Sequence, residues 1–396
     1  MTNTTYKQTA IGLIPSDWEV KKFNKVAKFY SGGTPLTSKK EYYNGIIPFI
    51  KSGEIYFDRT EQFISEEGLS NSSAKMVKTG DLLYALYGAN SGEIAICKIS
   101  GAINQAILCI QTEIDKIFIY NFLLNEKQTI ISKYLQGGQG NLSAEIIKNL
   151  QIPLPPLAEQ QKIAAILSTW DMAIDDCKGI IEELKVRNKG LTQKLFNKEF
   201  EKKHLSEIFE RVTTKNSEKN QNVITISAQR GFIKQTDFFN KIIASNILDH
   251  YTLVKKGDFC YNKSYSNGYD WGATKRLNDF EKAVVTTLYI CFRLKDENQN
   301  SGDFFEYYFE SEILYKGLSK VANEGGRAHG LLNVTSSDFF NIKIGVPTFE
   351  EQKAIATILD KATEELNQYQ QKLQTLQLQK KGLMQQLLTG KVRVKI

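Results

Sequence analysis

The chain has 396 residues, of which 41% are hydrophobic and 24% charged, and its formal net charge is +7. This length predicts two or three domains, and the composition is typical of a folded protein with hydrophobic cores, which excludes global disorder. The mild positive charge permits a nucleic-acid partner without requiring one, and the five scattered cysteines form no CxxC pair, which argues against a zinc ribbon or a disulfide framework.

The N-terminal segment, residues 1–18, is polar and lacks the apolar stretch of a secretion signal. No run of eighteen apolar residues occurs, so no membrane-spanning helix is predicted. The three histidines lie far apart in the sequence, so no metal site is expected. These features predict a cytoplasmic protein with reduced cysteines and no contact with a membrane.

The first expected domain covers residues 1–151 and mixes strand-like runs with turns and a helical stretch. A Val-Lys-Thr-Gly-Asp turn at 77–81 leads into an apolar strand at 82–84. A second strand-like run covers 102–110, and an aromatic helical stretch covers 118–124. A mixed α/β or α+β domain is therefore predicted.

A long helix is predicted in the next segment, residues 152–199, after a proline-rich start. Its apolar residues alternate at spacings of three and four, the pattern of a coiled-coil seam. The predicted seam residues are Leu167, Trp170, Ile174, Cys177, Ile181, Leu184, Leu191 and Leu195.

The second expected domain, residues 200–343, repeats the order of parts of the first. A Val-Lys-Lys-Gly-Asp turn at 254–258 again precedes an apolar strand, at 259–261, and a strand-like run follows at 283–291. An aromatic helical stretch at 304–315 and a glycine-rich loop complete the parallel. We therefore expect a second α/β or α+β domain related to the first by a pseudo-two-fold axis.

The last segment, residues 344–396, is a second copy of the helical block. Residues 344–389 align without a gap to residues 152–197 at an offset of 192, with 14 identities in 46 pairs, against about three expected by chance. Its seam residues are Leu359, Ala362, Leu366, Tyr369, Leu373, Leu376, Leu383 and Leu387. Each helix exposes an apolar edge, so the two copies are expected to pair antiparallel and to separate the two domains.

Glycines stand at matching places inside both predicted helices, at Gly190 and Gly382. A glycine in a helix costs about 1 kcal/mol relative to alanine. A close helix crossing or a partner surface would explain their presence, and a kink is the alternative.

Catalytic motifs are missing from the sequence. It contains no GxxxxGK[ST] phosphate loop, no GxSxG nucleophile elbow and no HExxH zinc motif. The [DNS]PP[YFW] motif of amino-methyltransferases is also absent. A non-catalytic binding protein is therefore favoured over an enzyme.

The run Ile152-Pro153-Leu154-Pro155-Pro156-Leu157-Ala158-Glu159-Gln160-Gln161-Lys162-Ile163 resembles the start of the central conserved region of type I restriction–modification specificity subunits. The second copy, 344–391, is similar to their distal conserved region, and residues 6–20 resemble their N-terminus. The second copy departs from the proline-rich pattern, with Gly345 and Thr348 in place of prolines. The resemblance covers the full length.

The resemblance implies two target-recognition domains, each binding one half of a bipartite double-stranded DNA site. The paired helices would set the spacer and dock two modification (methyltransferase) subunits, and restriction subunits would join the full complex. S-adenosylmethionine, ATP and Mg are then expected on the partner subunits, with no cofactor and no catalysis in this chain. DNA binding is expected to be weak in the isolated chain and tight in the complex.

Base readout favours Arg, Lys, Asn and Gln on loops, because these side chains present hydrogen-bonding groups to base edges. The candidates in the first domain are Lys51, Ser52, Arg59, Tyr87, Asn90, Ser91 and Gln139. Those in the second are Gln229, Arg230, Lys263, Tyr265, Asn267, Tyr269, Lys275, Arg276, Arg327 and His329. Arg59 is the only arginine before residue 151, whereas 201–343 contain five, so the second half-site is expected to be richer in guanine contacts.

Two alternatives remain at this stage. One is a specificity subunit of a type IIB or other type II restriction–modification complex, which differs only in its partner. The other is a coiled-coil interaction or scaffold protein that binds no DNA, which would explain the heptads but not the duplicated Pro-x-x-x-Glu-Gln start.

Overall fold

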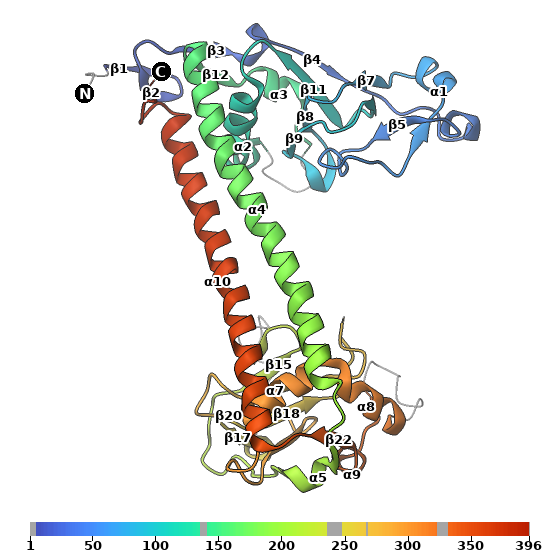
Figure 1. The fold of residues 1–396 in the computed structure, drawn as a ribbon. Coiled ribbons are helices and arrows are strands. Elements are labelled where there is room, and N and C mark those ends of the chain that lie inside the picture. Colours follow the sequence, from blue (N-terminus) through green and yellow to red (C-terminus); the bar gives the residue numbers. More distant parts are fainter. Residues whose placement is uncertain (1–4, 135–140, 236–247, 267, 323–331, 396) are drawn as a thin grey trace. The chain divides into compact units, whose positions relative to one another are not determined.

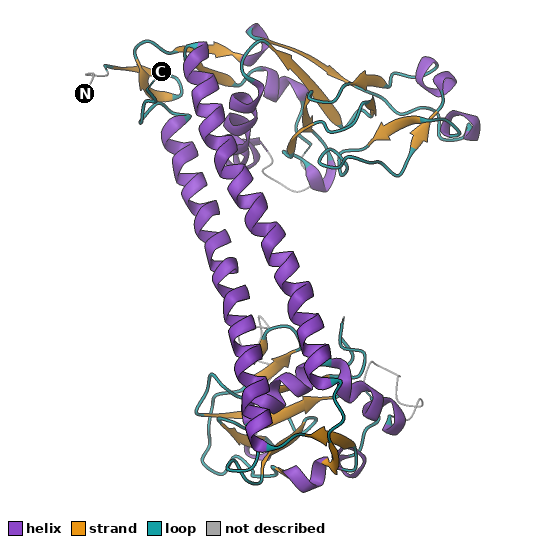
Figure 2. Cartoon of the chain, viewed as in Figure 1, coloured by secondary structure: helices purple, strands orange, loops and turns teal. Residues whose placement is uncertain are grey.

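The computed structural model describes residues 5–134, 141–235, 248–266, 268–322 and 332–395. The chain forms two compact units. Unit 1 comprises Met1–Gly179 with Gln371–Ile396, and unit 2 comprises Ile180–Gln370. Each unit contains a globular domain of mixed helices and strands (Figure 2) and part of each long helix, α4 (Leu157–Phe196) and α10 (Phe349–Leu387) (Figure 1). The four segments expected from the sequence thus contribute to two units.

Unit 1 contains an antiparallel sheet in the order β4-β11-β8-β9. Its strands are β4 (Ala27–Ser31), β8 (Leu82–Ala85), β9 (Ile94–Ile96) and β11 (Ile107–Thr112). A second sheet has the order β6-β5-β10-β7, in which β10 runs parallel to β5. Its strands are β5 (Ile47–Ile50), β6 (Phe63–Ile64), β7 (Lys75–Val77) and β10 (Gly101–Ile103).

Shorter elements complete the first domain. Two strand pairs lie next to the long helices, and they are formed by β1 (Tyr6–Thr9) with β2 (Gly12–Pro15) and by β3 (Glu19–Lys22) with β12 (Gln151–Leu154). The helices are α1 (Glu66–Ser70), α2 (Lys116–Tyr134) and α3 (Ala144–Lys148), with 3-10 turns η1 (Phe23–Lys25), η2 (Lys40–Tyr43) and η3 (Gly88–Asn90).

Unit 2 repeats this topology. The sheet β14-β21-β18-β19 corresponds to β4-β11-β8-β9, and β22 pairs with β13 as β12 pairs with β3. Its strands are β13 (Glu201–His204), β14 (Phe209–Arg211), β18 (Phe259–Asn262), β19 (Ala273–Arg276), β21 (Ile290–Leu294) and β22 (Lys343–Val346). The hairpin of β15 (Ile224–Ser227) and β16 (Gly231–Lys234) and the pair of β17 (Thr252–Lys255) with β20 (Lys282–Val285) correspond to the second sheet of unit 1.

The helices of unit 2 are α5 (Leu205–Ile208), α7 (Gly302–Glu310), α8 (Tyr315–Val321) and α9 (Ser336–Phe340), with 3-10 turns η4 (Leu248–His250) and η5 (Glu312–Leu314). Ser143 caps α3 and Thr335 caps α9 with their side chains. These two residues align in the duplicated sequence, so the repeat has kept the same helix start in both units.

Each unit has its own hydrophobic core, to which the long helices contribute. In unit 1, Trp18 and Phe118 are fully buried with Leu167 of α4 and Leu387 of α10. In unit 2 the core is rich in aromatic residues, and Phe259 and Phe292 stack with ring centroids 5.5 Å apart. The expectation of two α/β or α+β domains is confirmed.

The duplicated glutamines explain part of the repeated sequence. Gln160 accepts a hydrogen bond from the Asp115 amide at 3.0 Å, just before α2, and donates to the Pro155 carbonyl at 2.8 Å. Gln352 accepts from the Ser301 amide at 2.8 Å, at the start of α7, and donates to the Pro347 carbonyl at 3.0 Å. Each glutamine therefore ties the start of a long helix to the start of the domain's aromatic helix.

The long helices run antiparallel within each unit. In unit 1, Lys380 pairs with Asp171 at 2.5 Å, while Met384 and Leu387, further along α10, share a core with the earlier residues of α4. In unit 2, Asn188 donates to the Ala362 carbonyl at 2.9 Å. Every predicted seam residue is buried or half-buried.

The seam contains two polar residues that the sequence pattern left out, Asn188 and Lys380. They stand at equivalent positions of the repeat and fill the one gap in each series of apolar residues. A close helix crossing at Gly190 and Gly382 is not present, because a β-carbon at either position would meet nothing within 4 Å in the described structure.

Three predicted elements are divided in the structure. The run 102–110 becomes β10 and the start of β11, and 283–291 becomes the end of β20 and the start of β21. The stretch 304–315 becomes α7, η5 and the first residue of α8, because Ser311 interrupts the helix with extended backbone. No helix within the described ranges is long and apolar enough to cross a membrane.

Candidate DNA interface

Two loops of unit 1 meet beside the strands that carry them. The β5–β6 loop (residues 51–62) follows β5, and the β8–β9 loop (residues 86–93) contains η3. A β-carbon at Gly53 would lie only 3.2 Å from Nδ2 of Asn90. The two loops therefore form one continuous surface.

Glu54 organises the β5–β6 loop. Its carboxylate accepts hydrogen bonds from the Lys51 and Glu61 amides, both at 3.0 Å, and the Thr60 hydroxyl lies 3.0 Å from Oε2. Hydrogen bonds from amides to a carboxylate are stronger than bonds between neutral groups. One side chain thus joins the two ends of the loop.

Glu93 links the two loops to α2. The Tyr56 hydroxyl donates to its carboxylate, and the ammonium of Lys127 pairs with it at 2.5 Å. Burial acts to raise the pKa of Glu93, but the hydrogen bonds from Lys127 and Tyr56 outweigh it, so that the pKa lies below the ordinary 4.5. Glu93 is therefore ionised at neutral pH.

The predicted readers of unit 1 fall on these two loops. Arg59 is exposed, whereas Lys51, Ser52, Tyr87, Asn90 and Ser91 are partly buried. The Ser91 hydroxyl donates to the Leu86 carbonyl at 2.8 Å, which shapes the β8–β9 loop. Gln139 lies outside the described residues. The positions of these side chains do not test whether they contact a base, so their role in base readout stays a prediction.

The corresponding surface of unit 2 consists of the β15–β16 turn and the loop between β18 and β19. Gln229 and Arg230 are exposed at the turn, and Tyr265 is 59% exposed in the loop. Lys263 is partly buried, and its carbonyl accepts from the Leu332 amide. Asn267, Arg327 and His329 lie outside the described residues.

Three further candidates are engaged within unit 2. Lys275 pairs with Glu310 and lies 5.2 Å from the ring centroid of Tyr269. Burial, and then the nearby Glu310, raises the pKa of Tyr269 to about 12. Arg276 pairs with Asp303 at 2.5 Å and lies 3.6 Å from Glu306. The charges of Lys275 and Arg276 are thus matched by carboxylates of α7, and their predicted role in base readout is untested.

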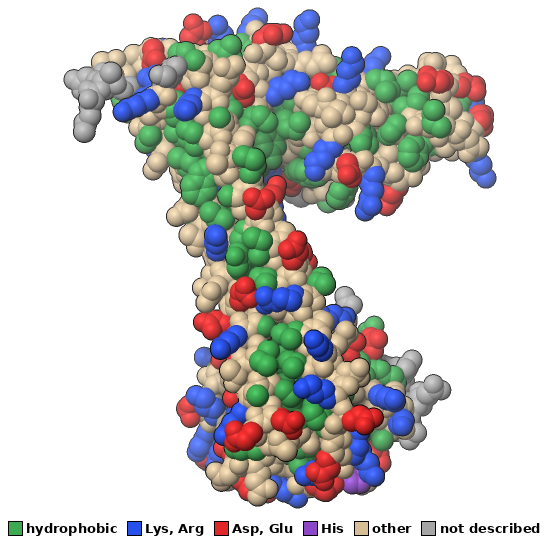
Figure 3. Space-filling model, in the orientation of Figure 1, with side chains coloured by type: hydrophobic (Ala, Val, Ile, Leu, Met, Phe, Trp, Pro, Cys, Tyr) green, Lys and Arg blue, Asp and Glu red, His purple; other side chains and the backbone are tan. Residues whose placement is uncertain are grey.

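Two exposed aromatic residues were not among the sequence candidates. Tyr56 and Phe57 of the β5–β6 loop are 39% and 54% exposed. The signal available in the sequence was an Ile-Tyr-Phe-Asp-Arg run, which equally suits a buried strand. On the face of each unit that Figure 3 shows, lysines and arginines lie among acidic residues and form no single basic patch there.

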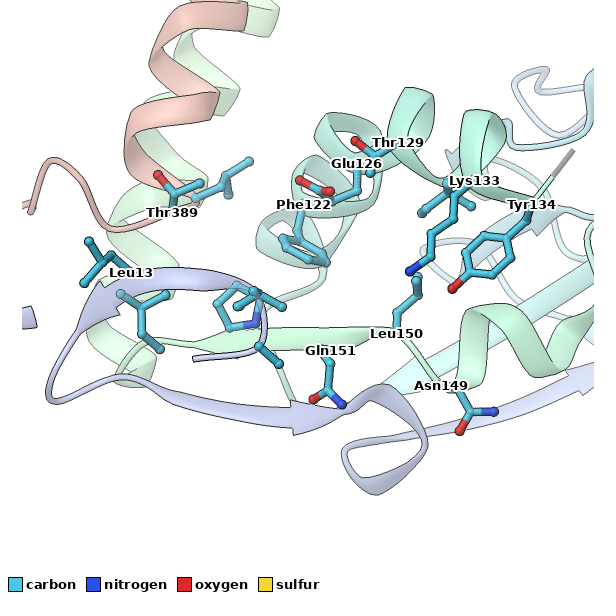
Figure 4. Close-up of a pocket in the computed structure, with 16 residues that line it drawn as sticks. Leu13, Phe122, Glu126, Thr129, Lys133, Tyr134, Asn149, Leu150, Gln151 and Thr389 are labelled. Carbon is cyan, nitrogen blue, oxygen red and sulfur yellow. The ribbon is translucent and has the colours of Figure 1, made fainter. Parts of the chain in front are cut away.

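A cavity of about 370 Å³ lies elsewhere in unit 1. Leu13, Phe122, Leu150 and Thr389 are among its lining residues, and they come from the N-terminal hairpin, α2, the segment before β12 and the turn after α10 (Figure 4). None of the predicted DNA-binding residues lines this cavity. The cavity is therefore separate from the candidate interface.

Comparison of the sequence with known proteins shows the family to which the chain belongs. The family described as "Type I restriction modification DNA specificity domain" matches the chain twice, at residues 15–186 and 197–378. The chain belongs to the family of type I restriction–modification DNA specificity domains. Each match contains one globular domain and most of the long helix that follows it.

Relatives of this specificity-domain family match this chain over nearly its full length or over part of it. The MjaVIII specificity subunit of Methanocaldococcus jannaschii, a type I restriction enzyme subunit, is 28% identical over 96% of this chain and 94% of its own. The MjaIX specificity subunit of the same organism is 34% identical over 44% of this chain and 43% of its own. The crystal structure of the S subunit from M. genitalium shares the fold, with a TM-score of 0.56 at 15% identity, and covers 100% of this chain and 98% of that one.

Proposed function

We propose that this chain is the DNA specificity subunit of a type I restriction–modification complex. In this proposal the globular domain of each unit binds one half of a bipartite double-stranded DNA site, and the paired helices set the spacer. The chain itself performs no catalysis. It acts in the cytoplasm, where the DNA to be modified lies.

The observation that carries the proposal is the duplication of the specificity domain in both sequence and topology. Two equivalent sheets each present a loop between corresponding strands, β8–β9 in unit 1 and β18–β19 in unit 2. Different loop sequences on the same framework suit the recognition of two different half-sites. Phosphate contacts would position each domain, and side chains that reach base edges would give the sequence preference.

The methyltransferase partners complete the proposed activity. Two modification subunits would dock on the helical region and carry S-adenosylmethionine and the methylation chemistry. Restriction subunits would add ATP- and Mg-dependent cleavage. The duplicated helical block supports two copies of one partner, because each copy offers equivalent exposed positions, such as Val186 and Leu378, which are 74% and 71% exposed.

Co-purification and DNA binding test this proposal. The chain is expressed with and without the modification subunit encoded in the same genome, and binding is measured on a library of genomic duplexes. We expect a stable complex that selects a bipartite sequence, with weak and unselective binding by the chain alone. Failure to bind the modification subunit, or selection of an uninterrupted site, would contradict the proposal.

A further inference from the structure

The β5–β6 loop of unit 1 is longer than the corresponding β15–β16 connection of unit 2. In unit 2 the corresponding strands β15 and β16 are joined by a tight turn, with Ser227 paired to Gly231. In unit 1 the chain leaves β5 at Ile50 and returns to β6 at Phe63. The two units therefore differ in the length of the loop that joins these corresponding strands.

The long loop is ordered from within. Besides the bonds to the Glu54 carboxylate, the Glu54 amide donates to the Lys51 carbonyl at 2.8 Å and the Phe57 amide donates to the Glu54 carbonyl at 2.9 Å. The Thr60 hydroxyl lies 2.9 Å from the Phe49 carbonyl, at the end of β5. A loop held in this way loses little conformational entropy on binding, which favours precise contacts.

The loop is also supported from outside. Tyr56 bonds to Glu93 of the β8–β9 loop, and Glu93 pairs with Lys127 of α2. The backbone at Gly53 lies against Asn90. The position of the loop is thus fixed relative to a helix and to the neighbouring candidate loop.

The tip of the loop, Phe57-Asp58-Arg59, keeps its side chains exposed although the backbone of Phe57 is held by Glu54. In the described ranges, no hydrogen bond or ion pair joins the exposed Arg59 side chain to another residue. One acid and one base leave the tip without net charge. A phosphate clamp would be expected to carry excess positive charge, so this composition favours contact with a base over contact with the backbone.

We propose that Arg59 is the specificity-determining residue by which unit 1 reads a guanine in the major groove, and that Glu54 is the positioning residue that aims it. Arginine presents two donors that match O6 and N7 of guanine. Phe57 beside it offers an apolar surface for the methyl group of an adjacent thymine. This inference rests on the proposed function and adds which base contact unit 1 makes and what orders it.

The test is a map of N6-methyladenine in cells whose gene for this chain is replaced by variants. Arg59→Ala removes the guanidinium group, and Arg59→Lys keeps the positive charge while removing the two parallel donors. Glu54→Gln keeps the shape of the organising side chain but removes its charge. Arg230→Ala removes the exposed arginine at the equivalent turn of unit 2, and Lys98→Ala removes an exposed charge of unit 1 outside the loops.

Both Arg59 variants should accept other bases at one position of one half-site, with discrimination falling about 10-fold to 100-fold, while the other half-site keeps its sequence. Glu54→Gln should relax the same position to a smaller degree. Arg230→Ala should affect only the other half-site, and Lys98→Ala should leave the motif unchanged. Because the Arg59 side chain is exposed and unpaired, its loss should not alter folding, which a thermal melt of the purified complex checks.

Three outcomes would overturn the inference. An unchanged motif in Arg59→Ala would show that the residue reads nothing. Normal methylation by Arg59→Lys would show that only charge matters. Loss of methylation at every site from an intact complex would mark Arg59 as a source of general affinity. Failure of the proposed function is distinguishable, since the wild-type gene would then produce no bipartite motif.

Discussion

Replacing Arg393 tests the contact between the end of the chain and its beginning in unit 1. The guanidinium bonds to both oxygens of Glu159, at 2.7 and 2.8 Å, and to both oxygens of Asp17, at 2.9 and 2.8 Å. Glu159 is fully buried and also accepts from the Trp18 indole at 2.9 Å. These carboxylates raise the pKa of Arg393, with the bonds to Glu159 as the largest cause.

The cost of Arg393→Ala follows from what it leaves behind. Among the described residues, only the Trp18 indole would still donate to the buried Glu159 carboxylate. Breaking a buried ion pair on one side lowers the free energy of unfolding by about 3–5 kcal/mol. The pair with Asp17 adds little, because that side chain is 53% exposed and exposed ion pairs contribute about 1 kcal/mol or less. The expected loss of unit 1 stability is therefore dominated by Glu159.

Native-state hydrogen exchange of the full chain measures this loss separately for each unit. Arg393→Ala should reduce the protection of the most stable amides in β3 and β12 by about 100-fold or more, at 1.4 kcal/mol per tenfold, while unit 2 remains unchanged. Asp17→Asn is the matched control and should change protection less than tenfold. Adding Glu159→Gln to Arg393→Ala should restore part of the loss. A loss below tenfold in Arg393→Ala would refute the argument.

Three further predictions concern the same framework. Gln160→Ala and Gln352→Ala should each lower the free energy of unfolding by about 1–3 kcal/mol, because each leaves backbone groups unpaired. Hydrogen exchange should show the loss of protection in unit 1 for Gln160→Ala and in unit 2 for Gln352→Ala. A loss spread over both units would contradict this prediction. Lys380→Leu should leave the stability of the chain unchanged or raise it by up to about 1 kcal/mol, since an apolar residue suits the seam and Asp171 stays 43% exposed. A thermal melt measures this, and a lower melting temperature would contradict the prediction. The bond from Arg393 lowers the pKa of Asp17 below its ordinary 3.8. The stability that the ionised Asp17 contributes is therefore present above pH 3.8 and is lost as the pH falls through the lowered pKa. Asp17→Asn should remove this part of the acid dependence in a pH titration of unfolding, and an unchanged profile would count against the argument.

The sequence predicted the parts of the fold that depend on local periodicity. The spacing of apolar residues indicated both long helices, and the 192-residue offset indicated two domains of one design. The polar seam positions Asn188 and Lys380 were missed because a pattern of apolar residues does not register them. Their partners, Ala362 and Asp171, lie on the other helix, which periodicity along one helix cannot reveal.

Contacts between distant segments were beyond the sequence. Nothing in the local sequence of Arg393 indicates that it meets Asp17, 376 residues earlier. The candidate loops were found because they concentrate polar and aromatic residues between strand-like runs. The tip at Phe57 and its support by Glu54 became visible only when the hydrogen bonds of the loop were known, since an isolated glutamate in a loop has no distinctive signature.

The central claim, that the two units give one complex a bipartite DNA specificity, is tested most directly by the methylation map of the native genome. The map is made by single-molecule sequencing with the gene intact, deleted and restored. The account predicts one bipartite motif, gap included, that carries N6-methyladenine, disappears on deletion and returns on restoration. A genome whose methylation is the same in all three strains, while the chain and its modification subunit are both present, would contradict it.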